Sequence, residues 1–218
     1  MYYKTVLFDF DGTLVDTADG IIRSLEYSFT ENGKEIPPLS VLQKFIGPPL
    51  ASSYQNFCGM DDAESEQMIM TFRQRYETKG LFESKVYEGI PELLGWLSDN
   101  GVNAGIASFK PQTMLETLLG YFDLKKYFAY TGGTSIENGD DDKASIVRRA
   151  AGYFGTDAGD TLMFGDRMYD IDGAHKAGFR CAGAVYGCGT LMELKEHKAD
   201  YLIEKPADLE RVVEAGRL

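Results

Sequence analysis

The chain has 218 residues, 44% of them hydrophobic, which is enough to bury the core of one domain with an insertion or of two small domains. Its formal net charge of −12 argues against binding a nucleic-acid polymer or an anionic membrane through a broad basic surface. No apolar stretch approaches the ~20 residues of a membrane span, and the N-terminus has no signal-peptide layout. The three cysteines lack paired spacing, so we expect free thiols in a cytoplasmic protein: Cys58, Cys181 and Cys188.

The first predicted strand is the apolar run at residues 6–8, which the sequence Asp9-Phe10-Asp11-Gly12-Thr13 follows directly. In an extended strand, residues i and i+2 share a face, so Asp9 and Asp11 could converge, and Gly12 permits a tight turn. Two carboxylates about 4 Å apart repel by roughly 4 kcal/mol at an effective dielectric of about 20. We therefore expect a cation beside them, and Mg²⁺ is the natural candidate for oxygen ligands. The alternative is an ordinary Asp-Gly turn after a strand.

Residues 16–84 contain several helical patterns and no convincing strand. Their first helix is predicted by apolar residues at helical spacing between Ala18 and Phe29, and Asn32-Gly33 ends it. The segment Phe45-Ile46-Gly47-Pro48-Pro49 is too rich in helix breakers for a helix interior. It is either a turn that places backbone and side chains for function or a plain loop between helices.

From Gly89 onward the pattern changes to helices that alternate with short apolar strands. Helices are predicted at 91–100, 111–119, 143–154, 171–177 and 190–196, and strands at 102–107, 128–131, 161–164, 179–185 and 201–203. This alternation predicts an α/β fold with a doubly wound, mainly parallel sheet. Ligands of such sheets bind at the carboxyl ends of the strands.

The residues at these strand ends share one chemistry. Ser108 follows the strand at 102–107, Asp166 and Asp170 follow the strand at 161–164, and Lys143 opens a helix between them. Taken singly, they could be a helix cap, helix N-terminal acids and part of a solvated charge run after Asp140-Asp141-Asp142. Taken together, carboxylates suit Mg²⁺ while a hydroxyl and an ammonium suit phosphate oxygens, which indicates metal-assisted phosphoryl transfer.

These four signatures, in this order, resemble those of the haloacid dehalogenase-like hydrolases, in particular the phosphoglycolate phosphatase-like branch with an inserted helical cap. The stretch GDRMYDIDGAHKAG at residues 165–178 and FIGPPL at residues 45–50 are similar to a subgroup described as phosphoglycolate phosphatases and 5'-nucleotidases. The resemblance implies a Rossmann-like catalytic core at residues 1–15 and 85–218 and an α-helical cap at residues 16–84. The acidic run before Lys143 is unusual for a phosphate-binding edge.

The resemblance also implies a role for each signature residue. Asp9 would attack phosphorus to form an aspartyl-phosphate, and Asp11 would protonate the leaving alkoxide and then activate water. Mg²⁺ would be held by Asp9, the backbone carbonyl of Asp11 and Asp166, with Asp170 supporting the metal shell. The phosphoryl group would be bound by Ser108, Lys143 and backbone N–H groups around Phe10 and Gly12. Phe109 falls in the same substrate-binding set, where relatives often carry a polar residue.

The predicted substrate is a small phosphorylated metabolite, with 2-phosphoglycolate the leading choice, and the protein could be a monomer or a homodimer. Asp11 favours phosphate esters over halogenated substrates, which have no leaving oxygen to protonate. A 5'-nucleotidase is the main alternative, in which Phe45, Tyr54 and Phe57 would stack a base unless they are core. A phosphomutase and a non-catalytic phosphate-binding module are further alternatives, the last disfavoured by the two acids. The cap would select the substrate, with loop 47–49 near the site, and we expect its cations to be surface charges: Arg23, Lys44, Arg73, Arg75 and Lys79.

Overall fold

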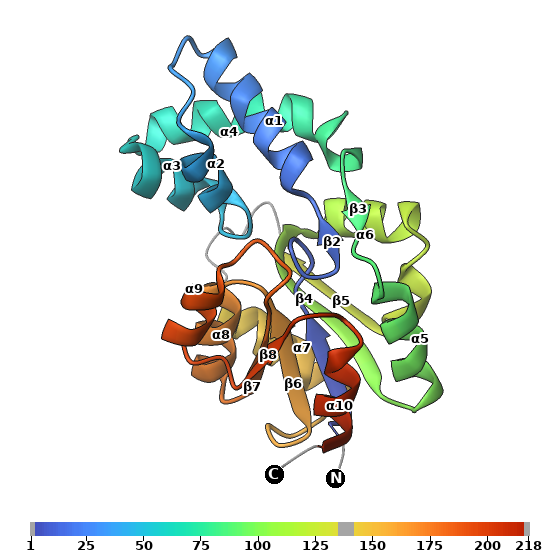
Figure 1. Cartoon of the computed structure of the whole chain (residues 1–218). Coiled ribbons are helices and arrows are strands. Elements are labelled where there is room, and N and C mark those ends of the chain that lie inside the picture. The colour runs from blue at the N-terminus through green and yellow to red at the C-terminus, as the bar shows by residue number, and fades with distance from the viewer. Residues whose placement is uncertain (1–2, 135–141, 216–218) are drawn as a thin grey trace. The chain divides into compact units, whose positions relative to one another are not determined.

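The computed structural model describes residues 3–134 and 142–215. The chain forms two compact units (Figure 1). The sheet unit comprises Met1–Val15 and Val86–Leu218, and the helical unit comprises Asp16–Lys85. The chain leaves the sheet unit within β2 (Val15–Asp16) and returns to it within β3 (Lys85–Val86). These two strands form a two-stranded sheet.

The sheet unit is built on a six-stranded sheet with the order β5-β4-β1-β6-β7-β8. Its strand pairs are all parallel. The strands are β1 (Thr5–Phe8), β4 (Asn103–Pro111), β5 (Tyr130–Thr134), β6 (Thr161–Gly165), β7 (Arg180–Ala184) and β8 (Tyr201–Ile203). The α/β fold predicted from the sequence is thus confirmed.

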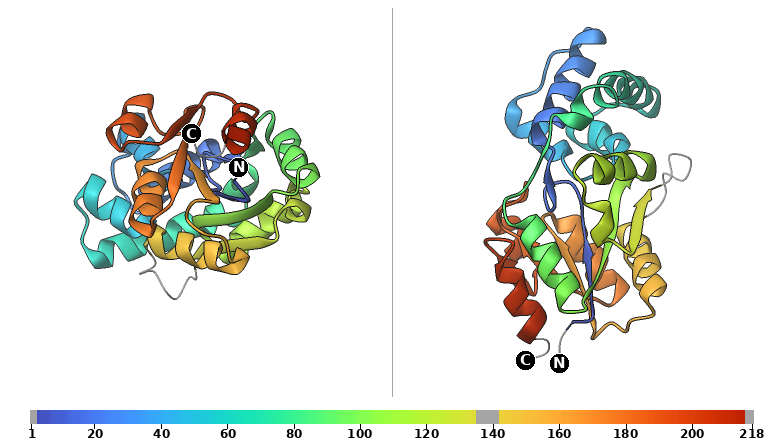
Figure 2. Two further views of the ribbon diagram at one scale, coloured as in Figure 1. Left: turned by 90° about the horizontal axis from the view of Figure 1, so that it is seen from below. Right: turned by 90° about the vertical axis from the view of Figure 1, so that its right-hand side faces the viewer.

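Helices cover both faces of this sheet (Figures 1 and 2). On one face, α7 (Lys143–Phe154) and α8 (Met168–Ala177) pack against each other and on the strands, with α9 (Leu191–Glu196) beside α8. On the other face lie α5 (Ile90–Asp99) and α10 (Asp208–Ala215). Two more helices, α6 (Gln112–Tyr121) and η3 (Lys125–Tyr127), connect β4 to β5.

The central strand β1 is buried along its whole length. Parallel strands covered on both faces are continuous apolar runs, and Val6-Leu7-Phe8 follows that rule. The Phe8 ring packs edge-on against Phe164 of β6, with centroids 5.8 Å apart. The strand that leads into Asp9 is also paired along its length with β4 on one side and β6 on the other.

The helical unit consists of α1 (Ala18–Glu31), α2 (Leu39–Leu42), η1 (Gln43–Phe45), α3 (Leu50–Cys58), α4 (Asp62–Tyr76) and η2 (Gly80–Phe82). Helix α4 packs against both α1 and α3. Two of the aromatic residues considered for base stacking, Phe45 and Tyr54, are buried in the core of this unit with ring centroids 5.0 Å apart. The core alternative is therefore the right one for these two residues, whereas Phe57 is half-buried.

Two expected boundaries are wrong. Strand β4 continues to Pro111, so Ser108 lies inside the strand rather than after it. The extension arises because Pro111 adopts an extended conformation (φ −54°, ψ 135°) and pairs with Thr134 before α6 begins. Strand β2 reaches into the segment predicted to lack strands.

No helix in the described part of the chain has the length and apolar character needed to cross a lipid bilayer.

Close packing of two glycines in the helical unit leads to a stability prediction. A Cβ on Gly20 of α1 would lie 1.9 Å from the Gly80 carbonyl oxygen, a backbone atom that cannot rotate away. We expect Gly20→Ala to lower the free energy of unfolding by about 1–3 kcal/mol.

A matched control is Gly95→Ala in α5, where a Cβ would meet nothing within 4 Å. Helix propensity should make that variant neutral or up to about 1 kcal/mol more stable. Urea unfolding followed by circular dichroism measures both, and equal values for the two variants would contradict the packing.

Candidate active site

Asp9 and Asp11 lie in a tight turn directly beyond β1. The Asp9 N–H donates to the Phe164 carbonyl (2.9 Å), which extends the pairing with β6 by one residue. Gly12 has φ +81°, a conformation that favours glycine, and its N–H donates to the Val15 carbonyl (2.8 Å) inside the same turn. The turn therefore fixes the backbone of both acids.

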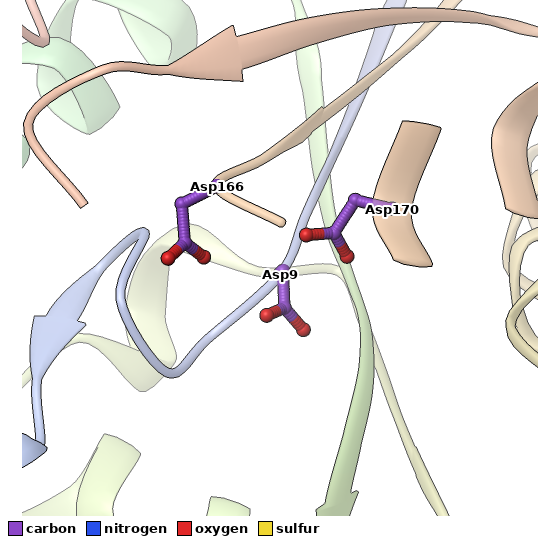
Figure 3. A group of neighbouring side chains, drawn as sticks. All are labelled: Asp9, Asp166 and Asp170. Atoms are coloured by element: carbon purple, nitrogen blue, oxygen red, sulfur yellow. The ribbon is translucent and has the colours of Figure 1, made fainter. Parts of the chain in front are cut away.

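Three carboxylates converge at this point (Figure 3). Asp9 follows β1, Asp166 follows β6 and Asp170 lies in the first turn of α8. One oxygen from each lies within 4.8 Å of the others, and all three residues are buried. Such an all-oxygen, all-anionic set suits a hard divalent cation such as Mg²⁺.

The surroundings of Asp166 are shaped by residues without side chains. A Cβ on Gly12 would lie 2.3 Å from an Asp166 carboxylate oxygen, and a Cβ on Gly187 would lie 2.3 Å from the Asp166 Cβ. A Cβ on Gly189 would lie 1.9 Å from the Asp166 carbonyl oxygen. Two loops can approach the carboxylate this closely only because glycine occupies these positions. The chemistry and spacing of the three carboxylate donors fit a small hard cation.

Lys143, the first residue of α7, links two of the three acids. Its ammonium lies 2.7 Å from Asp9 Oδ1 and 2.6 Å from Asp170 Oδ1. Burial alone would lower the pKa of Lys143, but the charges of Asp170 and Asp9 outweigh burial and raise the pKa. The lysine is therefore a fixed positive charge, and it lies 5.2 Å from the centre of the Phe109 ring.

Asp166 is held by two hydrogen bonds, from the Thr13 hydroxyl (3.0 Å) and from the Cys188 backbone N–H (2.8 Å). Burial, together with the charges of Asp170 and Asp9, raises the pKa of Asp166 to about 8. Burial likewise raises the pKa of Asp170. Both pKa values are raised by burial first and by the neighbouring carboxylates second, although Lys143 acts against the shift of Asp170.

Asp11 has a different partner from Asp9. The Lys110 ammonium donates to both Asp11 carboxylate oxygens, at 2.9 and 3.1 Å, and Lys110 is buried. The Asp11 carboxylate does not belong to the three-carboxylate group. From the sequence, Asp11 is expected to bind the metal through its backbone carbonyl only. The two acids of the motif thus stand beside separate lysines.

The other predicted substrate-binding residues lie around these pairs. Ser108 is buried, and its hydroxyl accepts from the Lys110 backbone N–H (3.2 Å), whereas the residue that caps α6 is Pro111. The Phe10 side chain is fully buried, so only its backbone could serve a ligand. Phe109 is half-buried and packs against Tyr169, with centroids 6.4 Å apart.

Several contacts in this region were not anticipated from the sequence, namely those of Thr13, Lys110, the Cys188 N–H and Glu193. Glu193 of α9 accepts from Arg167 Nε and from the Met168 N–H, each at 2.9 Å, and so ties α9 to the start of α8. Thr13 ends the first signature and Lys110 lies two residues after Ser108, and this proximity in the sequence is the signal that could have found them. Asp140 and Asp141 lie outside the described residues.

Asp142, the last residue of the acidic run, caps α7. It accepts from the Ser145 N–H (2.8 Å) and pairs with Lys176 (2.6 Å). The hydrogen bonds from Lys176 and Ser145 lower the pKa of Asp142 well below its usual range. This member of the run therefore orients the helix that carries Lys143.

The charges of the cluster do not balance within the described residues. Four buried carboxylates (Asp9, Asp11, Asp166, Asp170) face two buried ammonium groups (Lys110, Lys143). A third buried cation, Arg167, is balanced by its ion pair with Glu193 of α9. The difference is two negative charges, 4 − 2, which one divalent cation would neutralise. Charge count and geometry thus favour the same ligand.

This imbalance predicts that Mg²⁺ stabilises the protein in a pH-dependent way. Because the carboxyl pKa of Asp166 is raised, protons compete with the cation near neutral pH and below. We expect Mg²⁺ at ten times its Kd to stabilise the fold by about 1.4 kcal/mol at pH 8.5. The same Mg²⁺ concentration should stabilise it less at pH 6.

Thermal unfolding with Mg²⁺ or EDTA measures the effect, and Asp166→Asn is the control that should lose it. An equal Mg²⁺ shift at both pH values would contradict this account.

Comparison with known proteins places the chain in a family. Residues 6–184 match the model of the "Haloacid dehalogenase-like hydrolase" family. A 5'-nucleotidase of Pseudomonas aeruginosa is 34% identical over 98% of this chain and 96% of that protein. A phosphoglycolate phosphatase of Pseudomonas syringae is 30% identical over 84% of this chain and 70% of that protein.

A solved structure agrees with these sequence matches. The crystal structure described as a predicted phosphatase from Clostridium acetobutylicum superposes with a TM-score of 0.93 and is 36% identical. The match covers 98% of this chain and 100% of that one. The chain belongs to the haloacid dehalogenase-like hydrolases, and among them it is an enzyme of the phosphatase type.

Proposed function

We propose that the enzyme is a Mg²⁺-dependent phosphatase that hydrolyses a small phosphate monoester through an aspartyl-phosphate on Asp9. The observation that carries this proposal is the buried contact of Asp9 with Lys143, beside Asp166 and Asp170. A carboxylate that is held by an ammonium and lies at a cation site can attack phosphorus while the charge of the phosphate is offset.

In the first step, an Asp9 oxygen attacks phosphorus, a bond forms between them, and the ester P–O bond breaks. Lys143 orients Asp9 through its 2.7 Å contact. The Lys143 ammonium and the Ser108 hydroxyl would bind the phosphoryl oxygens, with backbone N–H groups of the turn around Phe10. Positioning and charge stabilisation account for most of the catalysis in phosphoryl transfer.

The cation would be held by Asp9, Asp166 and the Asp11 carbonyl, with Asp170 supporting the shell. When bound, it supplies positive charge that stabilises the transferring phosphoryl group. Because Gly12, Gly187 and Gly189 carry no side chains, none crowds the Asp166 carboxylate from these two loops.

Asp11 provides the proton chemistry. As a general acid it donates a proton to the departing alkoxide oxygen, and as a general base it then takes a proton from the water that attacks the phosphoenzyme. Hydrolysis returns Asp9 to its carboxylate and releases inorganic phosphate. The position of Asp11 in the turn, separate from the three-carboxylate group, supports this division of labour.

The substrate class has two candidates. Phosphoglycolate and a nucleoside 5'-monophosphate are each supported by one of the two relatives described above. Burial of Phe45 and Tyr54 removes two of the three aromatic residues considered for stacking a base, which favours a small substrate such as phosphoglycolate. We propose that residues 16–84 act as the cap that selects it.

The test is release of inorganic phosphate from p-nitrophenyl phosphate with and without Mg²⁺. We expect metal-dependent release that Asp9→Asn lowers by about three orders of magnitude or more, because this variant lacks the nucleophile. Full activity in Asp9→Asn, or phosphate release that does not depend on Mg²⁺, would contradict the mechanism.

A panel of 2-phosphoglycolate, nucleoside monophosphates and hexose phosphates then ranks the substrates. We expect phosphoglycolate to have a higher kcat/KM than the nucleotides. The reverse order would assign the enzyme to the 5'-nucleotidases.

A further inference from the structure

Lys110 is a buried ammonium that the chemistry above does not use. It lies near the end of β4, where the register against β5 shifts between Ala107 and Pro111. This irregularity lies at the carboxyl end of the strand, beside β1. A lysine is rarely buried this deeply unless its charge is paired.

The Lys110 ammonium binds both oxygens of the Asp11 carboxylate, at 2.9 and 3.1 Å. Among the described residues, these are the hydrogen bonds that the Asp11 side chain makes. The same ammonium lies 5.7 Å from the centre of the Phe10 ring, which is itself fully buried. Because the turn fixes the Asp11 backbone, Lys110 determines where its carboxylate stands.

The two acids of the motif are therefore held apart by two lysines. Asp9 contacts Lys143 and lies at the cation site, whereas Asp11 contacts Lys110 and is outside that group. Each acid of the motif thus has its own ammonium partner.

We propose that Lys110 is a positioning residue that holds Asp11 where it meets the leaving-group oxygen. This inference rests on the proposed function, because it gives Asp11 the role of general acid. Lys110 acts through Asp11 and needs no contact with the substrate.

A competing explanation is that Lys110 only adds positive charge for binding phosphate. A general electrostatic effect would weaken all phosphate esters alike and would raise KM. A positioning effect would lower kcat/KM most for esters whose leaving group needs a proton, because kcat/KM covers the step in which the leaving group departs. The two explanations therefore differ in how the loss depends on the leaving group.

The experiment compares wild type, Lys110→Met and Asp11→Asn on p-nitrophenyl phosphate, phenyl phosphate and p-methoxyphenyl phosphate with saturating Mg²⁺. These esters share a shape, but their leaving groups differ in basicity. We expect Lys110→Met to lose about tenfold more kcat/KM, which covers the steps through formation of the phosphoenzyme, on phenyl phosphate than on p-nitrophenyl phosphate, in parallel with Asp11→Asn. Lys110→Arg, which keeps a cation able to bind both oxygens, should recover part of the loss. Equal losses of kcat/KM across the series would overturn the proposal.

Lys110→Met leaves the Asp11 carboxylate buried without its cation, and this variant could fail to fold for that reason. The double variant Lys110→Met/Asp11→Asn avoids the problem because it also removes the carboxylate. If Lys110 acts through Asp11, the double variant should have the same kcat as Asp11→Asn alone. A further loss in the double variant would overturn the positioning role. Failure of the proposed function itself would appear separately, as wild-type enzyme without phosphate release that depends on Asp9.

Discussion

The repulsion among buried carboxylates is the constraint on which the rest of this structure depends. Asp9, Asp166 and Asp170 meet where water is excluded, and burial with mutual repulsion raises the pKa of the latter two. Such an arrangement persists only if cations lie among the acids and if the surrounding fold is stable enough to hold them. Lys143 provides one fixed cation between Asp9 and Asp170, and the excess negative charge leaves a place for a divalent one.

The topology explains why these residues meet although they are far apart in the chain. Strand β1 lies between β4 and β6: β4 and β5 lie on one side of it and β6, β7 and β8 on the other, so the segments after β1, β4 and β6 meet at one edge of the sheet. β1 brings Asp9 and Asp11, β6 brings Asp166, and the far end of β4 brings Lys110. Loop 185–190 closes around Asp166 because Gly187 and Gly189 leave room for its atoms. The sheet is thus a rigid base from which short loops place the acids, and the family match agrees with this arrangement.

The site residues that could be predicted from the sequence are those that come directly after a strand. Asp9 and Asp166 stand immediately after buried apolar runs, so strand periodicity placed them at one edge. Lys110 was not assigned a role because the apolar pattern of β4 stops at Ala107, and only pairing with β5 shows that the strand continues. The Cys188 N–H donor could not be predicted, because a backbone contact across 22 residues leaves no mark on residue type. Burial of Phe45 and Tyr54 likewise depends on how α1, α3 and α4 pack, which periodicity leaves open.

The central claim is that the phosphoryl group passes through Asp9 while Asp11 handles protons. The most direct test is to quench the Asp11→Asn variant with acid during turnover of p-nitrophenyl phosphate, whose leaving group needs no proton, and to map the phosphoryl group by peptide mass spectrometry. Loss of the general base should slow hydrolysis of the intermediate and let it accumulate. The account predicts a base-labile phosphoryl group on the peptide that contains Asp9. Turnover with no phosphorylated Asp9, or phosphate on another residue, would contradict it.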